Sequence, residues 1–135
     1  RGGISLLPVV DGPTFSTEQF ALTGSVQSHA YENVQAVEAA AVQNEEKGEV
    51  CLFLINRAAT DDIEVSLDAR GFEGYGFTEH IEMYTDDLTK GNSFDHPDAI
   101  RPTLHAGMKQ DGGKATAVLK RLSWNVIRLS KNKQG

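Results

Sequence analysis

Acidic side chains are the residues of this chain best suited to do chemistry, because two carboxylates about 5–10 Å apart can cleave a glycosidic bond. Glu45-Glu46 falls at the tip of a predicted hairpin, where charge faces solvent. Glu79 and Glu82 are an odd number of residues apart, so a regular strand directs them to opposite faces. Two further adjacent pairs are Asp61-Asp62 and Asp86-Asp87. None of these pairs has the character of an acid–base couple, and we assign no catalytic residue.

Oxygen ligands for a metal are gathered in one loop-forming segment. Oxygen-rich loops can hold calcium, but the spacing here lacks the alternating ligands, central glycine and closing glutamate of an EF-hand. The histidines have neither zinc-site spacing nor cysteine partners. We therefore interpret the segment as a solvated loop and assign no metal ligand. The residues concerned are Asp86, Asp87, Asn92, Asp95 and Asp98 in the loop, and the histidines His29, His80, His96 and His105.

Motifs for a nucleophile or a nucleotide cofactor are absent. There is no Gly-x-Ser-x-Gly elbow, and the glycine-rich segment 71–76 lacks the following helix that phosphate binding requires. The single cysteine, Cys51, cannot form an internal disulfide. It lies in the apolar run Val50–Ile55, so it is predicted to be a small buried hydrophobe. No cofactor is implied.

Aromatic residues are the remaining candidates for a ligand site, as a platform for sugar rings. Aromatic side chains in strands belong more often to the core. Trp124 stands inside an apolar run, and it too is predicted to be core. The others are Phe72, Tyr75, Phe77 and Tyr84.

Composition limits the class of protein. The 135 residues, 39% of them hydrophobic and 24% charged, suit one soluble domain. A net charge of −6 argues against a nucleic-acid or anionic-membrane partner. No apolar run approaches the ~18 residues of a membrane span. The chain begins at Arg1 without methionine or a visible signal peptide, and we expect it to be a fragment whose missing part holds the chemistry.

Short apolar runs separated by turn residues predict an all-β antiparallel sandwich. Ile4 to Val10 carries Pro8 and is predicted to be an edge strand or an extended lead-in. The next residues are irregular, with at most one helical turn from Thr17 to Leu22. A long loop is predicted from Thr85 to Arg101. The predicted strands are Val37–Asn44 and Glu49–Arg57, joined as a hairpin, then Ile63–Asp68, Tyr75–Tyr84, Lys114–Leu119 and Ser123–Leu129.

Two of these strands are apolar on both faces. Ile63–Leu67 alternates strictly, which is typical of a strand with one face in water. Val50–Ile55 and Trp124–Ile127 do not alternate, and a strand of this kind needs cover on its outer face as well. The cover is supplied either by the domain itself or by a neighbouring domain.

Several segments follow one another in an order that is specific as a set. They are the hairpin Ala39–Glu46 and Leu52–Arg57 with its closing Asn-Arg pair, the turn and strand Arg70–Tyr75 and Glu79–Ile81, the loop positions Asp87, Leu88, Asn92, Pro97 and Pro102, and the closing strand Leu122–Leu129. In this order they resemble the C-terminal domain of family 51 α-L-arabinofuranosidases. The similar segments extend over about residues 34–130, and Leu7–Val10 resembles the family's exit from its barrel, whereas 15–31 is longer than in the family.

This resemblance implies a jelly-roll-like β-sandwich over 34–135, preceded by a lead-in from a catalytic barrel over 1–33. It implies a bacterial, cytoplasmic, often hexameric parent that removes terminal α-L-arabinofuranosyl residues from arabinan, arabinoxylan and arabino-oligosaccharides. The parent's two catalytic glutamates lie on a (β/α)8 barrel, and no position here matches either motif. The family's sandwich also takes a strand from the N-terminus of the full chain, so an unpaired sheet edge is expected.

Three functions follow from these expectations. The first is a structural domain that packs on its own barrel and supports a homo-oligomer. The second is a carbohydrate-binding module, which needs an exposed aromatic platform or a polar groove. The third, an independently active enzyme, is the least supported because no catalytic pair was found.

Overall fold

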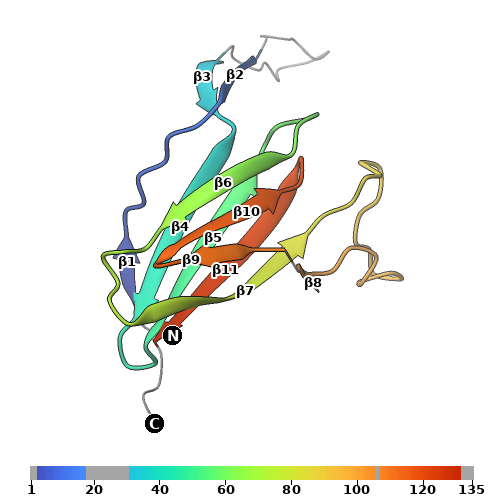
Figure 1. The fold of residues 1–135 in the computed structure, drawn as a ribbon. Coiled ribbons are helices and arrows are strands. Elements are labelled where there is room, and N and C mark those ends of the chain that lie inside the picture. Colours follow the sequence, from blue (N-terminus) through green and yellow to red (C-terminus); the bar gives the residue numbers. More distant parts are fainter. Residues whose placement is uncertain (1–2, 18–30, 106, 132–135) are drawn as a thin grey trace.

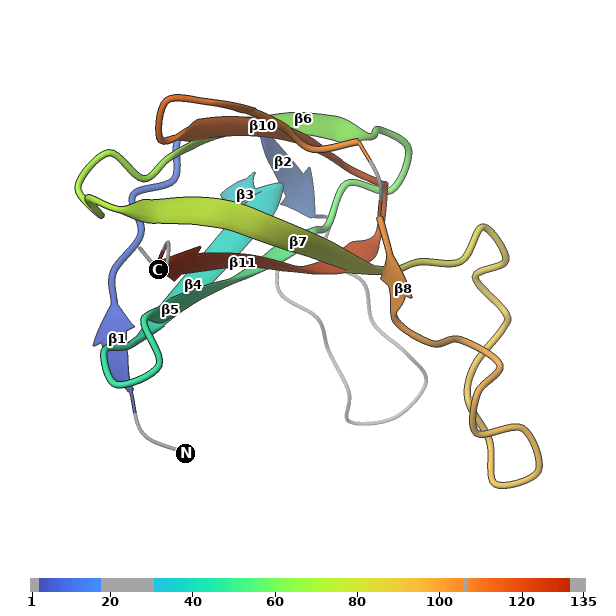
Figure 2. The ribbon, with the colours of Figure 1, turned by 60° about the horizontal axis from the view of Figure 1, so that its bottom comes forward.

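The computed structural model describes residues 3–17, 31–105 and 107–131, which form a two-layered β-sandwich (Figures 1 and 2). The larger layer is a six-stranded sheet in the order β1-β4-β5-β11-β7-β8, and the smaller is a three-stranded sheet, β6-β10-β9. A separate ribbon joins β2 and β3. The strands are β1 (Ile4–Leu6), β2 (Thr14–Thr17), β3 (Tyr31–Gln35), β4 (Val37–Asn44), β5 (Glu49–Asn56), β6 (Ile63–Asp68), β7 (Tyr75–Met83), β8 (Thr103–Leu104), β9 (Lys109–Asp111), β10 (Lys114–Leu119) and β11 (Ser123–Lys131).

The predicted all-β sandwich is confirmed, and so are most of its strands. The hairpin β4–β5 turns at 45–48, where Gly48 adopts the left-handed φ of 62° that glycine tolerates. β6 and β10 have the predicted bounds, whereas β7 ends one residue early and β11 continues to Lys131. β1 is an edge strand that ends before Pro8, as a residue without a backbone donor requires.

The ribbon β2–β3 and the short strands β8 and β9 were not predicted. Their segments are polar or very short, so they lack the alternation that identifies a strand. Of the predicted helical turn over 17–22, Thr17 belongs to β2 instead, and residues 18–22 lie outside the described residues. The loop between β7 and β8 is irregular throughout, as predicted.

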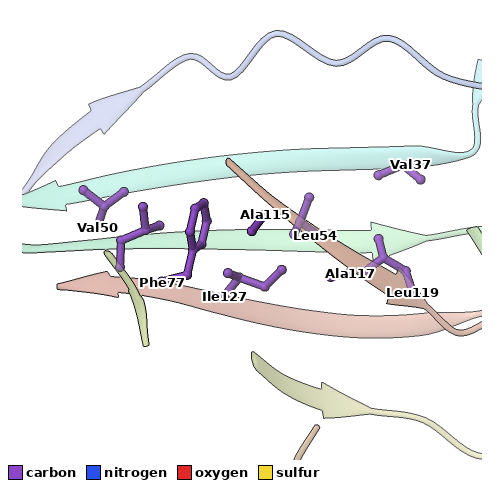
Figure 3. Close-up of a cluster of buried hydrophobic side chains, with 9 residues drawn as sticks. Val37, Val50, Leu54, Phe77, Ala115, Ala117, Leu119 and Ile127 are labelled. Carbon is purple, nitrogen blue, oxygen red and sulfur yellow. The ribbon is translucent and has the colours of Figure 1, made fainter. Parts of the chain in front are cut away.

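The core lies between the two sheets (Figure 3). β11 is central, because it pairs with β5 on one side and β7 on the other and directs Ile127 and Leu129 inward. Small alanines on β10 allow the three-stranded sheet to approach closely. The buried cluster is Val37, Val50, Leu54, Phe77, Ala115, Ala117, Leu119, Ile127 and Leu129.

A bulge in β7 decides which of its side chains enter this core. The pairing with β11 shifts between Arg128 and Leu129, so Thr78 is the extra residue. Its hydroxyl donates a hydrogen bond to the Arg128 carbonyl, 3.1 Å away. The shift places Phe77 inward, opposite Leu129, while Glu79 faces outward opposite Arg128.

One sheet edge is open beside an apolar cavity. Among the described residues, β6 pairs only with β10, so its other edge has no partner strand. A cavity of about 630 Å³ between the sheets opens there, lined by Leu6, Val10, Val37, Leu52, Val65 and neighbouring residues. An unpaired edge is therefore present, as expected. That a strand of a longer parent chain occupies it stays a prediction from the family resemblance.

Removing a buried branched side chain tests this core. Ile127 has no exposed surface, so Ile127→Ala should lower the free energy of unfolding by about 2–5 kcal/mol in urea denaturation. Leu7→Ala is the control, because Leu7 is almost fully exposed and its loss should cost less than about 0.5 kcal/mol. Equal effects of the two substitutions would contradict the assignment of the core.

Candidate functional site

The outer face of the six-stranded sheet is the most unusual surface of the described chain. Cross-strand partners share a face, so the register arranges its side chains in three rows across β4, β5, β11 and β7. The middle row is wholly apolar. The rows are Glu38, Ile55, Trp124 and Met83; then Ala40, Phe53, Val126 and Ile81, extended by Leu104 on β8; then Val42, Cys51, Arg128 and Glu79.

Trp124 belongs to this outer face, and the prediction that it is core is wrong. Its exposed fraction is 52%, and Phe53 next to its row is 37% exposed. The error has a simple cause: β11 alternates, so Ser123, Asn125, Ile127 and Leu129 face inward while Trp124 faces the other way. An apolar run along a strand does not reveal whether its second face is covered. Within the described residues, nothing buries it.

Trp124 stands at the rim of a shallow hollow of about 610 Å³. Leu122 adopts a left-handed φ of 49° in the turn that leads into β11, and its side chain is partly exposed beside the hollow. The exposed surface of the lining is mostly apolar, and Tyr84, Thr85 and Ser123 contribute hydroxyl groups. The lining residues are Ile55, Asn56, Arg57, Met83, Tyr84, Thr85, Ile100, Leu122, Ser123 and Trp124.

Ion pairs stand at two opposite corners of the outer face. Arg57 binds Glu38 across 3.1 Å and also donates from Nε to the Gln35 carbonyl, 3.1 Å away. Its guanidinium lies 5.8 Å from the centre of the Phe15 ring. At the other corner, Arg128 lies 2.6 Å from Glu79. All four charged groups therefore have partners within the chain.

Cys51 also lies on the outer face, contrary to the prediction that it is core. It is only partly buried and stands opposite Arg128 in the register of β5 and β11. A hydrogen bond with Cys51, together with the charge of Glu79, raises the pKa of the Arg128 guanidinium. The thiol thus borders a cation that is distant in sequence.

The inner face of the same sheet carries a polar cluster at the end nearest β8, which sequence reasoning missed. His80 is fully buried, and its Nε2 donates to Asn125 Oδ1 at 2.8 Å, while Asn125 Nδ2 donates to Ser123 Oγ at 2.8 Å. The ring of His105 lies 4.6 Å from that of His80, and Glu82 is 3.9 Å from His105 Nε2. The sequence contained a signal for this cluster, because polar residues alternate with apolar ones at His80 and Glu82 on β7 and at Ser123 and Asn125 on β11.

Burial is the main influence on the pKa of His80. It lowers the pKa of the imidazole, and the neighbouring His105 acts in the same direction, whereas the bond to Asn125 and the charge of Glu82 oppose it. Nδ1 of His80 has no hydrogen-bond partner. The folded domain therefore favours the neutral imidazole of His80 over the protonated one.

The predicted carboxylate pairs are not brought together as an acid–base couple. Glu45-Glu46 lies in the exposed hairpin turn, and Glu79 and Glu82 face opposite sides of β7, as predicted. Asp62 accepts the Arg121 N–H and pairs with Lys120, and the Arg121 bond chiefly lowers its pKa. A general acid needs a raised pKa instead.

The acidic loop is held by its own hydrogen bonds. Asp87 accepts bonds from the amide and hydroxyl of Thr89, which lower the pKa of its carboxyl. Asn92 bridges the loop to the backbone of Ile100 through both side-chain atoms. Across 3–17, 31–105 and 107–131, no three side chains of His, Cys, Asp or Glu converge as a metal site would require.

The other aromatic candidates behave as predicted. Phe77 is buried in the core, and Phe72 and Tyr75 pack against it with their rings edge-on at 5.7 Å. Tyr84 is partly buried at the hollow. Trp124 alone among the aromatic candidates is an exposed ring on a sheet face.

These features define a class: an antiparallel β-sandwich domain with an apolar outer face and, in the part of the chain that is described, no catalytic couple. No helix in that part is long and apolar enough to cross a membrane.

Comparison with known proteins gives the family. Residues 1–123 match the family model described as the α-L-arabinofuranosidase C-terminal domain, so the chain belongs to that family of domains. It is 36% identical over 129 residues to the intracellular exo-α-(1→5)-L-arabinofuranosidase of Acetivibrio thermocellus. It is 31% identical over 129 residues to the intracellular exo-α-(1→5)-L-arabinofuranosidase 1 of Bacillus subtilis. Each alignment includes 96% of the chain but 23% of the relative, so the chain spans less than a quarter of these proteins.

Solved structures agree on the fold. A family 51 α-L-arabinofuranosidase from Bifidobacterium longum matches 92% of the chain and 22% of its own length with a TM-score of 0.75 and 23% identity. The α-L-arabinofuranosidase of Thermotoga maritima matches 87% of the chain and 23% of its own length with a TM-score of 0.70 and 18% identity. The resemblance to the family 51 C-terminal domain is confirmed.

Acidification tests the polar cluster. The unfolded chain binds a proton at His80 near the ordinary pKa of 6.5, whereas the folded chain resists it, so stability should fall as the pH drops below about 6.5. Urea midpoints at about pH 7.5 and about pH 5.5 measure this loss. His80→Gln should reduce the difference between the two midpoints, and His96→Gln, in the exposed loop, should not. An undiminished difference in His80→Gln would contradict the assignment.

Proposed function

We propose that the chain is the non-catalytic C-terminal domain of an α-L-arabinofuranosidase. In this proposal the parent enzyme hydrolyses terminal α-L-arabinofuranosyl residues of arabinan, arabinoxylan and arabino-oligosaccharides with retention of configuration. Its two glutamates are supplied by a (β/α)8 barrel outside this chain. The observation that carries the proposal is the match of residues 1–123 to the C-terminal domain of this enzyme family.

The arrangement of carboxylates supports a non-catalytic role. Retaining hydrolysis needs two carboxyl groups about 5–5.5 Å apart, one of them with a raised pKa. The acidic side chains described here are exposed, paired with cations or held in loop hydrogen bonds. Glu82 is buried, but the ionisable group beside it is the imidazole of His105, 3.9 Å away, rather than a second carboxylate.

The domain's role in the parent is structural. It packs on its own barrel, stabilises it and supports a homo-oligomer in the bacterial cytoplasm. The relatives from Acetivibrio thermocellus, Halalkalibacterium halodurans and Bacillus subtilis are named as intracellular enzymes, which supports this location. Oligomer support rests on the family resemblance.

A carbohydrate-binding module is the alternative that one observation favours, namely the half-exposed Trp124 beside the hollow. Sugar sites combine an aromatic face with several polar groups that orient the hydroxyls. Here the Arg57 guanidinium already binds Glu38 and Gln35, and Asn56 is used by Leu119, Asp61 and Ala58. Few free polar groups remain, which favours the structural role.

Activity of the purified chain tests the proposal directly. We expect no release of chromophore from an aryl α-L-arabinofuranoside above the uncatalysed rate. The relative from Acetivibrio thermocellus, assayed in parallel, is the positive control. Hydrolysis that survives repeated purification of this chain would overturn the non-catalytic assignment.

Titration with arabino-oligosaccharides tests the alternative. Isothermal titration calorimetry reports binding without relying on Trp124, the single tryptophan of the chain, and we expect no saturable heat change. Saturable binding that is lost in Trp124→Ala and Tyr84→Ala, with unchanged unfolding midpoints, would establish a binding module instead. Phe94→Ala, which removes a fully exposed aromatic ring that does not line the hollow, is the matched control.

A further inference from the structure

β8 and the loop before it are weakly attached to the sandwich, and Figure 2 shows the loop projecting away from the two sheets. β8 has two residues, both exposed, and it pairs with Ile81 and Glu82 at the outer edge of the six-stranded sheet. The loop over 84–102 is bridged by hydrogen bonds of its own, such as those between Asn92 and Ile100. A segment with so few buried contacts belongs to the part of a protein that opens most easily.

His105 is the side chain by which this segment enters the interior. Its backbone N–H donates to the His80 carbonyl across 2.7 Å, and its ring centre lies 4.6 Å from that of His80. The His105 side chain is 24% exposed, whereas His80 is fully buried. Among the described residues, no member of the buried apolar cluster comes from β8 or from the loop over 84–102. The segment is therefore joined to the interior mainly through one histidine packed on another.

Three polar atoms around this contact are buried without a hydrogen bond from the described chain. They are Nδ1 of His80, Nδ1 of His105 and Oε2 of Glu82. Burial of an unpaired polar atom is unfavourable, because the atom has lost its hydrogen bonds to water. Movement of His105 away from His80 would let water reach all three atoms. A partly satisfied polar cluster of this kind is a weaker anchor for β8 than a fully bonded one.

A proton on His80 would add a charge that the closed cluster does not accommodate. Nε2 of His80 already donates to Asn125, and a protonated ring also needs an acceptor for its Nδ1–H, which the described chain does not provide. The ionisable groups that act on the ring are His105, at the end of β8, and Glu82 of β7, whereas β11 supplies the neutral Asn125 and Ser123. Burial, reinforced by His105, accordingly lowers the pKa of the His80 imidazole while β8 is in place.

Opening of β8 reverses this effect. With the His105 ring removed, water reaches the His80 imidazole, and its pKa returns toward the ordinary value of 6.5. The open form therefore binds a proton more readily than the closed form, and acid shifts the equilibrium toward opening. One additional proton makes the open form more populated by up to about tenfold for each pH unit below about 6.5.

We propose that β8 and the loop over 84–102 together form a latch that acid releases. In the closed form, His105 packs on His80 and β8 pairs with the edge of β7. Acid raises the population of an open form, in which the latch has left that edge while the two sheets and their apolar core stay packed. Gly107, two residues after His105, has a φ of 150°, which residues with side chains rarely adopt, and it provides a flexible joint on one side of the latch.

Release of the latch also changes the outer face of the six-stranded sheet. The hollow beside Trp124 is lined in part by the loop, through Tyr84, Thr85 and Ile100, so it opens when the loop moves. The departure of β8 also leaves β7 with an unpaired edge, which is a place where another strand can add. The latch does not depend on the proposed function, because it concerns only contacts within this chain.

Hydrogen exchange of backbone amides, followed by NMR, tests the latch directly. The His105 amide reports opening of β8, because it donates to the His80 carbonyl, and the Ile127 amide reports unfolding of the whole domain, because β11 is paired on both sides. After correction for the intrinsic exchange rate, the His105 amide should be much less protected than the Ile127 amide. Its protection should also fall by about tenfold from about pH 7.5 to about pH 5.5.

Matched substitutions identify the histidine that is responsible. His80→Gln removes the ring that takes up the proton, so protection of the His105 amide should lose most of its dependence on pH. His96→Gln makes the same replacement in the exposed part of the loop, and it should leave the fall in protection unchanged.

A disulfide provides a test that leaves the polar cluster untouched. Ile81 and Leu104 are cross-strand partners in the outer row of the sheet, so Ile81→Cys with Leu104→Cys joins β7 to β8, in a chain that also carries Cys51→Ser. The oxidised variant should protect the His105 amide severalfold better in acid, since β8 then leaves only when the whole domain unfolds. The reduced form of the same variant is the control, and it should exchange as the unsubstituted chain does.

Any of four results would overturn the latch. Equal protection of the His105 and Ile127 amides would mean that β8 opens only with the whole domain. Protection of the His105 amide that is the same at both pH values would mean that opening takes up no proton. The other two are an undiminished fall in protection in His80→Gln and an unchanged His105 amide in the oxidised disulfide variant. If His80→Gln does not fold, the disulfide variant decides the question.

Discussion

The pairing of β11 with both β5 and β7 is the constraint on which the rest of the structure depends. Because β11 is hydrogen-bonded on both edges, its register fixes which side chains of three neighbouring strands share a face. Ile127 and Leu129 then meet β10 in the core, while Trp124 and Val126 are left on the outside. A slip of one residue would exchange the two sets. The core and the apolar outer face are two results of one register.

Much of the fold could be predicted from the sequence because its central strands are long and apolar. The hairpin from Val37 to Asn56 and the alternating Ile63–Asp68 segment contain enough residues for the period to be plain. β8 and β9 could not be found in this way. They have two and three residues, and they exist because β7 and β10 offer edges to which they pair.

The surfaces were harder to predict than the strands. Val50–Ile55 was correctly interpreted as apolar on both faces, yet Cys51 and Trp124 were both assigned to the core. Hydrophobicity alone does not distinguish burial inside a domain from burial between domains, since both remove the same apolar area from water. The polar cluster around His80 was missed for the opposite reason. Histidine and asparagine at inward positions are buried only because neighbouring strands supply their hydrogen bonds.

The extra residue in β7 reverses the inward and outward alternation of side chains within a single strand. Phe77, Ile81 and Met83 share one parity in the sequence, so an uninterrupted strand would send all three to the same side. With Thr78 set out of the ladder, the strand supplies an aromatic ring to the interior and two aliphatic chains to the exterior. Deleting this one small residue would therefore exchange the environments of Phe77 and its neighbours while leaving the apolar composition untouched.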